Sequence, residues 1–489
     1  MSLQSVKTYA RLLPLLVYLI LGCAYLYCIR ADHNWGDDFA FYFSQARALT
    51  QHSVDRLIEY NLFCIKASSA EFFSPVLAPW GWPILLSVVY LFFGANIVAF
   101  KVLVILFFFL FLGMLYLLFK NKLNVVLLHV FIFYLFANTY YFDHTTVVLS
   151  ELPFLFFAAL GLYLIDRYDG QSPTLRLMIV MGIVLSFAAF IRTEGVLLFG
   201  ALLSVQLRQV LQTKVVTIGV WKRIGIPYIS AGVFVLLFIS FFDSGFISHV
   251  NHLKLVSAQT VVQSLERLYN GYGALFSPYL AQPLKSLVYG LFLLGLFSRF
   301  CRDLPISIFL IGLLAVFIIW PFHELRYLYL SFPFILYFNI QGLVRFSTYL
   351  FKGLVFAYSV AAVAVVVTAI GFYVHLGRID RSAVTEGPYT AQSKEMFQYI
   401  REYTDSDAVV VFFRPRALTF FAERRSAMIY DYIENVIMAG DYMVLDHGKG
   451  SYFQIDPDTV EAYRQRFPTK LVEVFHNRQF TVFKILKDG

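Results

Sequence analysis

Long apolar runs separated by short polar turns fill the first three quarters of the chain. An α-helix needs about 20 apolar residues to cross the hydrocarbon core of a bilayer. About eleven runs approach this length, at residues 12–29, 97–119, 123–141, 145–165, 177–191, 195–207, 224–242, 284–297, 304–320, 327–344 and 353–374. The pattern predicts an α-helical polytopic membrane protein with about eleven transmembrane helices.

Two apolar segments near the start need separate treatment. The run at 12–29 follows Lys7 and Arg11, and no small-residue cleavage site comes after it, so we expect a retained membrane helix. The run at 80–94 is too short to cross comfortably, and we place it outside as a juxtamembrane or re-entrant helix. The expected transmembrane domain is residues 1–375, with a first outer loop at 30–96.

Residues 376–489 have the pattern of a small, separate α/β domain. Apolar stretches predict strands at 408–413, 442–445, 471–475 and 480–485, and the periodicity predicts helices at 393–403 and 458–467. A segment of roughly 110 residues is long enough to bury a core of its own.

The composition supports a membrane protein. Hydrophobic residues make up 59% of the chain and charged residues 14%, whereas soluble domains average about 45 to 50% and about 25%. The formal net charge is +8. In a membrane protein such an excess usually marks cytoplasmic loops, so we expect no nucleic-acid partner.

The distribution of basic residues predicts the orientation. Most of those that flank the apolar runs fall in turns on one side, namely Lys7, Arg11, Lys120, Lys122, Arg167, Arg176, Arg208, Lys214, Lys222, Arg223, Arg299, Arg302, Arg345 and Lys352. The positive-inside rule then puts the N-terminus in the cytoplasm. The first loop, a middle loop at 243–283 and the C-terminal domain face outward, as in a multi-pass protein of the cytoplasmic (inner) membrane.

Two adjacent carboxylates lie early in the first outer loop. Asp37 and Asp38 follow Gly36 and open a predicted amphipathic helix that contains Phe41 and Ala-Arg-Ala-Leu at 46–49. Acidic residues are common in first helical turns, where they face free backbone amides, so helix capping is one interpretation. Catalysis is the other.

These residues resemble the acidic motif in the first external loop of GT-C glycosyltransferases. Further segments resemble that family in the same order, namely Pro-Trp-Gly-Trp-Pro at 79–83, Ser-Glu-Leu-Pro at 150–153, Ile-Arg-Thr-Glu-Gly at 191–195 and Arg-Tyr at 326–327 with Pro333. The protein mannosyltransferase and aminoarabinose transferase branch is the most similar. Because that family often has Asp-Glu where this chain has Asp37-Asp38, either acid remains a candidate for the catalytic one.

The resemblance implies an inverting glycosyltransferase that moves a sugar from a polyprenyl-phosphate donor to a lipid, glycan or protein acceptor on the outer face. Such a reaction needs a base for the acceptor hydroxyl, and a carboxylate can serve. Asp37 is the first candidate and Asp38 the second. The departing phosphate also needs cations, helix N-termini or a divalent ion.

Two outer turns offer residues that could bind the donor phosphate. Arg192 and Glu194 form one set, and His323, Glu324, Arg326 and Tyr327 form the other. Ionisable groups at the edges of apolar spans are costly unless they are paired or functional. The structural alternatives are an Arg192–Glu194 pair that holds a tight turn, and an interfacial aromatic turn around Arg326.

A divalent cation such as Mg or Mn is a possible cofactor. His144 and Glu151 are one helical heptad apart and could join Asp37 or Asp38 around a metal. Histidine and carboxylate alone do not select a metal. A polar helix start bonded to neighbouring helices is the simpler interpretation.

Two other functions are alternatives, and each would require different sequence features. A transporter or flippase of lipid-linked sugars could use the intramembrane charges, but no internal repeat is visible. A glycan polymerase or ligase should carry arginines in a large middle loop, which here offers only Lys254 and Arg267 with His249 and His252.

The C-terminal domain could cap the site or bind the acceptor. Its basic segments at 414–416 and 423–425 could meet an anionic surface, although ordinary solvated charge is the simpler interpretation.

Overall fold

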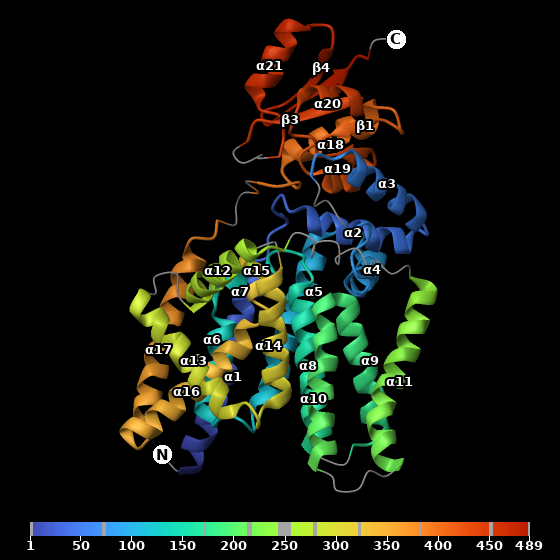
Figure 1. The fold of residues 1–489 in the computed structure, drawn as a ribbon. Coiled ribbons are helices and arrows are strands. Elements are labelled where there is room, and N and C mark those ends of the chain that lie inside the picture. The colour runs from blue at the N-terminus through green and yellow to red at the C-terminus, as the bar shows by residue number, and fades with distance from the viewer. Residues whose placement is uncertain are drawn as a thin grey trace.

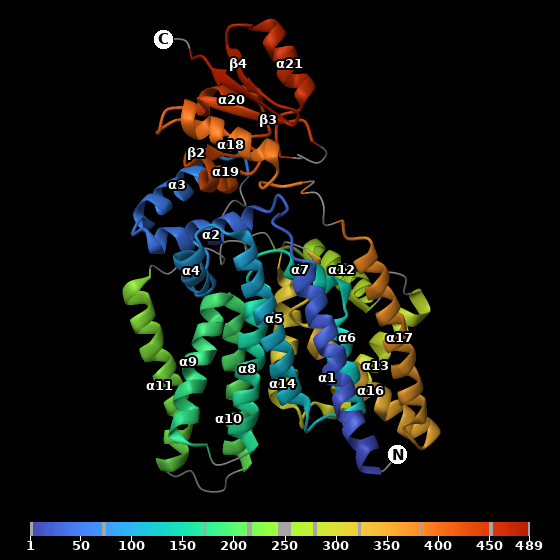
Figure 2. The same ribbon diagram turned by 180° about the vertical axis from the view of Figure 1, so that it is seen from behind.

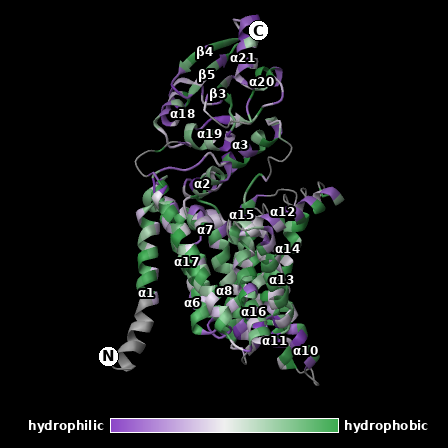
Figure 3. Cartoon of the chain, turned by 90° about the vertical axis from the view of Figure 1, so that its left-hand side faces the viewer, coloured by the Kyte–Doolittle hydropathy of each residue, from purple (hydrophilic) through white to green (hydrophobic). Residues whose placement is uncertain are grey.

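The computed structural model describes residues 3–70, 75–170, 173–212, 218–242, 256–276, 281–320, 324–380, 384, 386–448 and 453–487. A bundle of long helices forms one end of the molecule, an α/β domain forms the other, and shorter helices lie between them (Figure 1). Apolar residues dominate the bundle, whereas polar and apolar residues alternate in the α/β domain (Figure 3). His249, His252, Lys254 and His323 are outside the described residues.

The apolar runs fold into helices as predicted. The bundle contains α1 (Leu3–Tyr27), α5 (Ile97–Phe119), α6 (Val125–Phe136), α7 (Thr139–Thr145), α8 (Glu151–Gly170), α9 (Leu175–Ile191), η1 (Thr193–Val196), α10 (Leu197–Gln212), α11 (Ile218–Phe241), α13 (Gln282–Arg299), α14 (Leu304–Ile319), α16 (Phe332–Phe351) and α17 (Val355–Gly377).

Length and hydropathy make the chain a multi-pass membrane protein. Among the described residues, 4 helices are long and apolar enough to cross a bilayer, at Ile97–Phe119, Thr193–Gln212, Ile218–Phe241 and Val355–Gly377. The bent pair α6 and α7 raises this number to 5. Several other apolar helices are shorter, so the expected count of about eleven spans is not confirmed by this criterion.

The run at 123–141 is not the single helix that the sequence predicts. It breaks between α6 and α7, and the two helices are bent by 51°. The side chain of Asn138 causes a new helix to start, because its oxygen accepts hydrogen bonds from the backbone N–H groups of Tyr140 and Tyr141. The next helix begins at Glu151 instead of residue 145, which leaves a turn at the outer end of the bundle.

The two ends of the bundle differ in charge. The N-terminus, the end of α10, the start of α11, and the α13–α14 and α16–α17 connections lie at the end away from the α/β domain (Figures 1 and 2). Basic residues gather at this end, among them Arg208, Arg223, Arg299 and Arg302. Buried Asp303 holds this end together by pairing with Lys122 at 3.1 Å and with Arg299 at 2.8 Å.

A layer of short helices covers the other end of the bundle. It consists of α2 (Asp37–Thr50), α3 (Val54–Ala67), α4 (Gly81–Phe93), α12 (Ala258–Phe276) and α15 (Leu325–Leu328). The run at 80–94 forms α4, and α12 is a helix that the sequence interpretation left as loop. Gly81 lets α4 touch α9, because a Cβ there would lie 2.7 Å from the backbone of Phe190 and Ile191.

The C-terminal domain contains one mixed sheet with strand order β2-β1-β3-β5-β4. Its strands are β1 (Val409–Val411), β2 (Arg425–Ala427), β3 (Tyr442–Asp446), β4 (Leu471–His476) and β5 (Phe480–Ile485), and its helices are α18 (Ala391–Tyr403), α19 (Pro415–Ala422), α20 (Ile433–Ala439) and α21 (Pro457–Arg466). Strand β1 pairs in parallel with β2 and β3, while β5 is antiparallel to β3 and β4. The prediction missed β2, α19 and α20, because these elements are only three to eight residues long.

The loop at 30–96 holds the C-terminal domain in place. Arg47 of α2 donates a hydrogen bond to the carbonyl of Phe420 in α19 at 3.0 Å and lies over that residue's ring. Gly387, with φ +98°, passes so close to the loop that a Cβ would lie 1.7 Å from the carbonyl oxygen of His33. The two parts of the chain therefore meet directly above the outer end of the bundle.

Candidate active site

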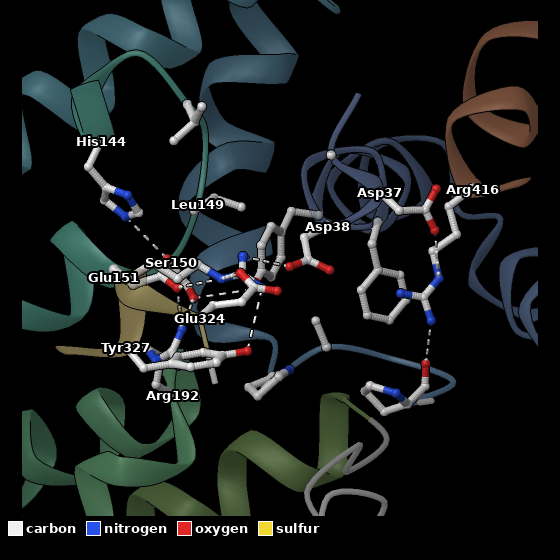
Figure 4. A pocket seen from close by; sticks show the side chains of 18 of the residues that line it. Asp37, Asp38, His144, Leu149, Ser150, Glu151, Arg192, Glu324, Tyr327 and Arg416 are labelled. Carbon is white, nitrogen blue, oxygen red and sulfur yellow. Dashed lines mark hydrogen bonds and ion pairs between the residues drawn. The ribbon is translucent and has the colours of Figure 1, made fainter. Parts of the chain in front are cut away.

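A cavity of about 670 Å³ lies where the bundle, the short-helix layer and the C-terminal domain meet. Each predicted site residue that the structure describes lines this cavity: Asp37, Asp38, His144, Glu151, Arg192, Glu194, Glu324, Arg326 and Tyr327. Figure 4 shows two groups of side chains, one around Glu151 and Arg192 and one around Asp37 and Arg416, with Asp38 between them.

Asp37 is an almost enclosed carboxylate at the start of α2. Its side chain is 12% exposed, and its Oδ1 accepts a 3.4 Å hydrogen bond from the backbone N–H of Ala417 in α19. Burial raises the pKa of Asp37 to about 6, although nearby Arg416 and Arg414 act in the opposite direction. Near neutral pH this carboxylate is ionised and is a stronger base than an ordinary aspartate.

Asp38 has a different environment. Its side chain is 40% exposed, and its Oδ2 pairs with Nη1 of Arg326 at 2.8 Å. The Nε of Arg326 pairs with Glu324 at 2.6 Å, and Glu324 is itself 58% exposed. Arg326 thus sits between two carboxylates, both of which reach the open part of the cavity.

Arg192 is more enclosed than Arg326. It caps the end of α9 and pairs with Glu151 at 3.0 Å and with Glu194 at 2.9 Å. It also donates a 3.2 Å hydrogen bond to the hydroxyl of Ser150, which in turn contacts the Tyr42 hydroxyl. The Arg192–Glu194 pair that the sequence suggested as a structural alternative is therefore present, within a larger network.

The surroundings of Glu151 do not suit a divalent cation. Its Oε2 lies 3.5 Å from Nε2 of His144, and its Oε1 faces the guanidinium of Arg192. A second cation would be repelled by Arg192 and by Arg326, whose Nε lies 4.0 Å away. Within the described part of the chain, no group of three or more histidine, cysteine or acidic residues is arranged to hold a metal.

The sequence interpretation missed two arginines and a histidine of this cavity. Arg414 and Arg416 come from the C-terminal segment expected to carry solvated charge, but Arg416 is only 8% exposed and lies 3.9 Å above the ring of Phe41. Solvated charge is therefore the wrong interpretation for Arg416. A long-range contact between domains leaves no periodic signal in the sequence.

His33 ties the first loop to the bundle. Its Nδ1 donates to the carbonyl of Asn34, and its Nε2 accepts from the backbone N–H of Val148, each at 3.0 Å. Burial lowers the pKa of His33 to about 4, so the imidazole is neutral at physiological pH. It acts as a fixed link beside the acid pair.

No family model and no curated relative match this sequence. Solved structures, in contrast, match this chain. ArnT from Cupriavidus metallidurans, crystallised with undecaprenyl phosphate, matches with a TM-score of 0.57 over 97% of this chain and 98% of its own, at 13% identity. This chain has a GT-C fold.

A second neighbour agrees. The archaeal oligosaccharyltransferase AglB from Archaeoglobus fulgidus, in complex with an inhibitory peptide and a dolichol-phosphate, matches with a TM-score of 0.51 over 90% of this chain and 70% of its own, at 12% identity. Another AglB structure, with Zn and sulfate, has a TM-score of 0.52 and 12% identity, and covers 88% of this chain and 67% of that one. The GT-C fold spans both the helical bundle and the C-terminal domain of this chain.

Proposed function

We propose that this protein is an integral-membrane inverting glycosyltransferase that transfers a hexosyl or pentosyl unit from a polyprenyl-phosphate donor to an acceptor. One observation carries the proposal. An acid pair and two arginines from three separate segments converge on one cavity, in a fold shared with an enzyme crystallised with undecaprenyl phosphate.

Asp37 serves as the general base. The proton of the acceptor hydroxyl passes to its carboxylate, the acceptor oxygen bonds to the anomeric carbon, and the bond from that carbon to the phosphate oxygen breaks. A single displacement inverts the anomeric centre. The enclosed setting favours this role, because a base works best when its pKa lies near the working pH.

Arg326 stabilises the leaving phosphate. Its partner Glu324 is more than half exposed, whereas the partners of Arg192 are almost enclosed, so Glu324 can give way to a phosphate more easily than they can. Arg192, held by two carboxylates, keeps the network in position. Asp38 orients Arg326 from the other side.

The donor lipid approaches from the membrane side of the cavity. A second hollow of about 510 Å³ lies next to the first and shares Phe317, Trp320, Glu324 and Tyr327 with it. Helices α12, α14 and α15 line this hollow, close to the bundle. We place the first part of the polyprenyl chain here, so that its phosphate meets Arg326.

The cavity faces outward in this account. The basic turns collect at the opposite end of the bundle, which the positive-inside rule assigns to the cytoplasm. The N-terminus is then cytoplasmic and the C-terminal domain extracytoplasmic. A lipid, glycan or protein acceptor would enter from the outside, between α2 and the C-terminal domain. No step here is assigned to a divalent cation.

The test is comparative mass spectrometry of lipids and envelope glycans from cells with and without the protein. We expect one envelope component to lose a hexose or pentose, and a polyprenyl-phosphate sugar to accumulate. Unchanged glycans and lipids would contradict the proposal. Complementation with Asp37→Asn, which should not restore the missing unit, ties the result to the site.

A further inference from the structure

Arg414 differs from the other arginines of the cavity in its ion pairing. Arg192, Arg326 and Arg416 each have a carboxylate oxygen within 4.0 Å. Within the described ranges, Arg414 has no such partner. Its buried Nε has no hydrogen bond, and its guanidinium lies 5.7 Å from the ring centre of Phe413 and 5.5 Å from that of Phe453.

The Nε of Arg414 is buried without a hydrogen bond, which is costly unless a ligand supplies an acceptor. Asp37 acts on Arg414 electrostatically but forms no ion pair with it. The aromatic rings on either side hold the guanidinium by cation–π contacts but leave its hydrogen-bond donors available. Arg414 is therefore prepared for an oxyanion, such as a phosphate or a carboxylate, which a guanidinium binds with two parallel hydrogen bonds.

The topology of the C-terminal sheet supports a binding role independently. Arg414 follows β1, Met428 follows β2 and Phe453 follows β3, and these three strands are parallel neighbours. All three residues line the cavity. The carboxyl ends of parallel strands are where open α/β sheets bind ligands, because loops diverge there to leave a crevice.

The position of Arg414 assigns it to the acceptor. Arg414 belongs to the C-terminal domain and Asp37 accepts a hydrogen bond from that domain, whereas Arg326 belongs to α15, which lines the second hollow together with α14 of the bundle. A donor anchored in the bilayer reaches the second hollow, and the base must stand next to the acceptor hydroxyl. An anion bound at Arg414 is then carried by the molecule whose hydroxyl Asp37 deprotonates.

We propose that Arg414 is a specificity-determining residue that binds an acidic group, a phosphate or a carboxylate, of the acceptor. This inference rests on the proposed glycosyltransferase function. It narrows the acceptor to molecules with an oxyanion close to the hydroxyl that receives the sugar.

The test uses the full-length protein in neutral detergent, with inorganic phosphate as the probe for Arg414 and undecaprenyl phosphate as the probe for the donor site. Thermal unfolding is followed while each probe is titrated. In the wild-type protein we expect phosphate to raise the Tm even when undecaprenyl phosphate is saturating. In Arg414→Gln the phosphate affinity should fall about tenfold or more, the usual effect of losing a charge-assisted contact.

Two variants serve as controls. Arg466→Gln removes an exposed arginine of α21, far from the cavity, and should leave both titrations unchanged. Arg414→Lys keeps the charge and should recover part of the phosphate response. Arg414→Gln should bind undecaprenyl phosphate as the wild-type protein does, which also shows that it folds.

Three results would overturn the inference. They are a wild-type protein that does not respond to phosphate, an Arg414→Gln variant with the wild-type response, and a loss of undecaprenyl phosphate binding in Arg414→Gln, which would assign Arg414 to the donor. The titration with undecaprenyl phosphate tests the proposed function separately. If the wild-type protein does not bind undecaprenyl phosphate, the proposed function itself is contradicted.

Discussion

Asp37 and Asp38 are adjacent in sequence but lie in different environments, and we propose different roles for them. Asp37 is nearly enclosed and accepts a hydrogen bond from the first turn of α19, whereas Asp38 is open to the cavity and paired with Arg326. The sequence analysis put Asp37 first and Asp38 second but had no contact to support that order, because the residues that distinguish them lie about 290 and 380 positions away. Hydrophobic periodicity reports the local secondary structure and does not reveal contacts between residues so far apart in the sequence.

The first prediction concerns the base. Asp37→Asn should lower transfer by about 10² to 10⁴, the usual contribution of a general base, while undecaprenyl phosphate still binds. Asp55→Asn, an exposed carboxylate of α3 in the same loop, is the matched control and should retain full activity. Normal turnover in Asp37→Asn would remove the general-base assignment.

The second prediction is a pH profile. Because the base must be ionised and its pKa is about 6, transfer should fall about tenfold per pH unit below pH 6. Arg416→Gln removes a positive charge that favours the ionised form, so the acidic limb of the profile should move to higher pH. If the acidic limb of the profile does not move in Arg416→Gln, the ionisation of Asp37 does not determine that limb.

The third prediction concerns stability at the same residue. The folded protein binds more protons at Asp37 than the unfolded chain between pH 3.8 and about 6. The free energy of unfolding therefore falls as the pH rises through this window. At pH 7.5, Asp37→Asn should raise the stability by about 1 to 3 kcal/mol, and at pH 4 the gain should be small. Thermal unfolding at both pH values measures the difference, and Asp55→Asn should show no gain at either.

At the scale of elements, hydropathy located the helices and failed at their interruptions. Asn138 ends one helix and caps the next inside a continuous apolar run, so periodicity could not separate α6 from α7. Likewise β2 is a three-residue strand containing arginine and serine, which its pairing with β1 and its packing against α3 stabilise. The shape of the cavity depends on the break before α8, since the residues that lead into Glu151 line the cavity.

The fourth prediction tests the contact between α4 and α9. In Gly81→Ala the new methyl group would lie 2.7 Å from the backbone of Phe190 and Ile191. Overpacking of this kind costs about 1 to 3 kcal/mol, so the Tm should fall. Donor use should weaken as well, because the displaced backbone leads directly into Arg192.

Gly113→Ala is the control for this change. It also lies in a helix, but nothing stands within 4 Å of its Cβ position. Its Tm should stay the same or rise slightly, since alanine favours the helix. If Gly81→Ala and Gly113→Ala are equally stable, the close approach at Gly81 does not affect the stability of the protein.

At the scale of the whole molecule, the C-terminal domain is part of the site and not an appendage. The sequence predicted a small α/β domain at the C-terminus, and the structure has a five-stranded sheet with helices there. What the sequence could not predict is that this domain forms one wall of the cavity through Arg414, Arg416 and Phe453. That relation depends on tertiary docking against α2 and α3.

The fifth prediction concerns orientation. In a Cys23→Ser background, native Cys301 lies exposed in the α13–α14 turn and Asp458→Cys lies exposed in α21. A membrane-impermeant maleimide should label position 458 in intact spheroplasts and should reach Cys301 only after permeabilisation. The opposite labelling pattern would put the cavity in the cytoplasm.

The most direct measurement is transfer itself, reconstituted from purified protein and from lipid and envelope extracts of cells that lack it. Such extracts should contain both the accumulated donor and the unmodified acceptor. We expect the wild-type protein to release polyprenyl phosphate as the sugar appears on the acceptor, and the Asp37→Asn/Asp38→Asn variant to release none. Equal release by both proteins, or release by neither, would contradict the account.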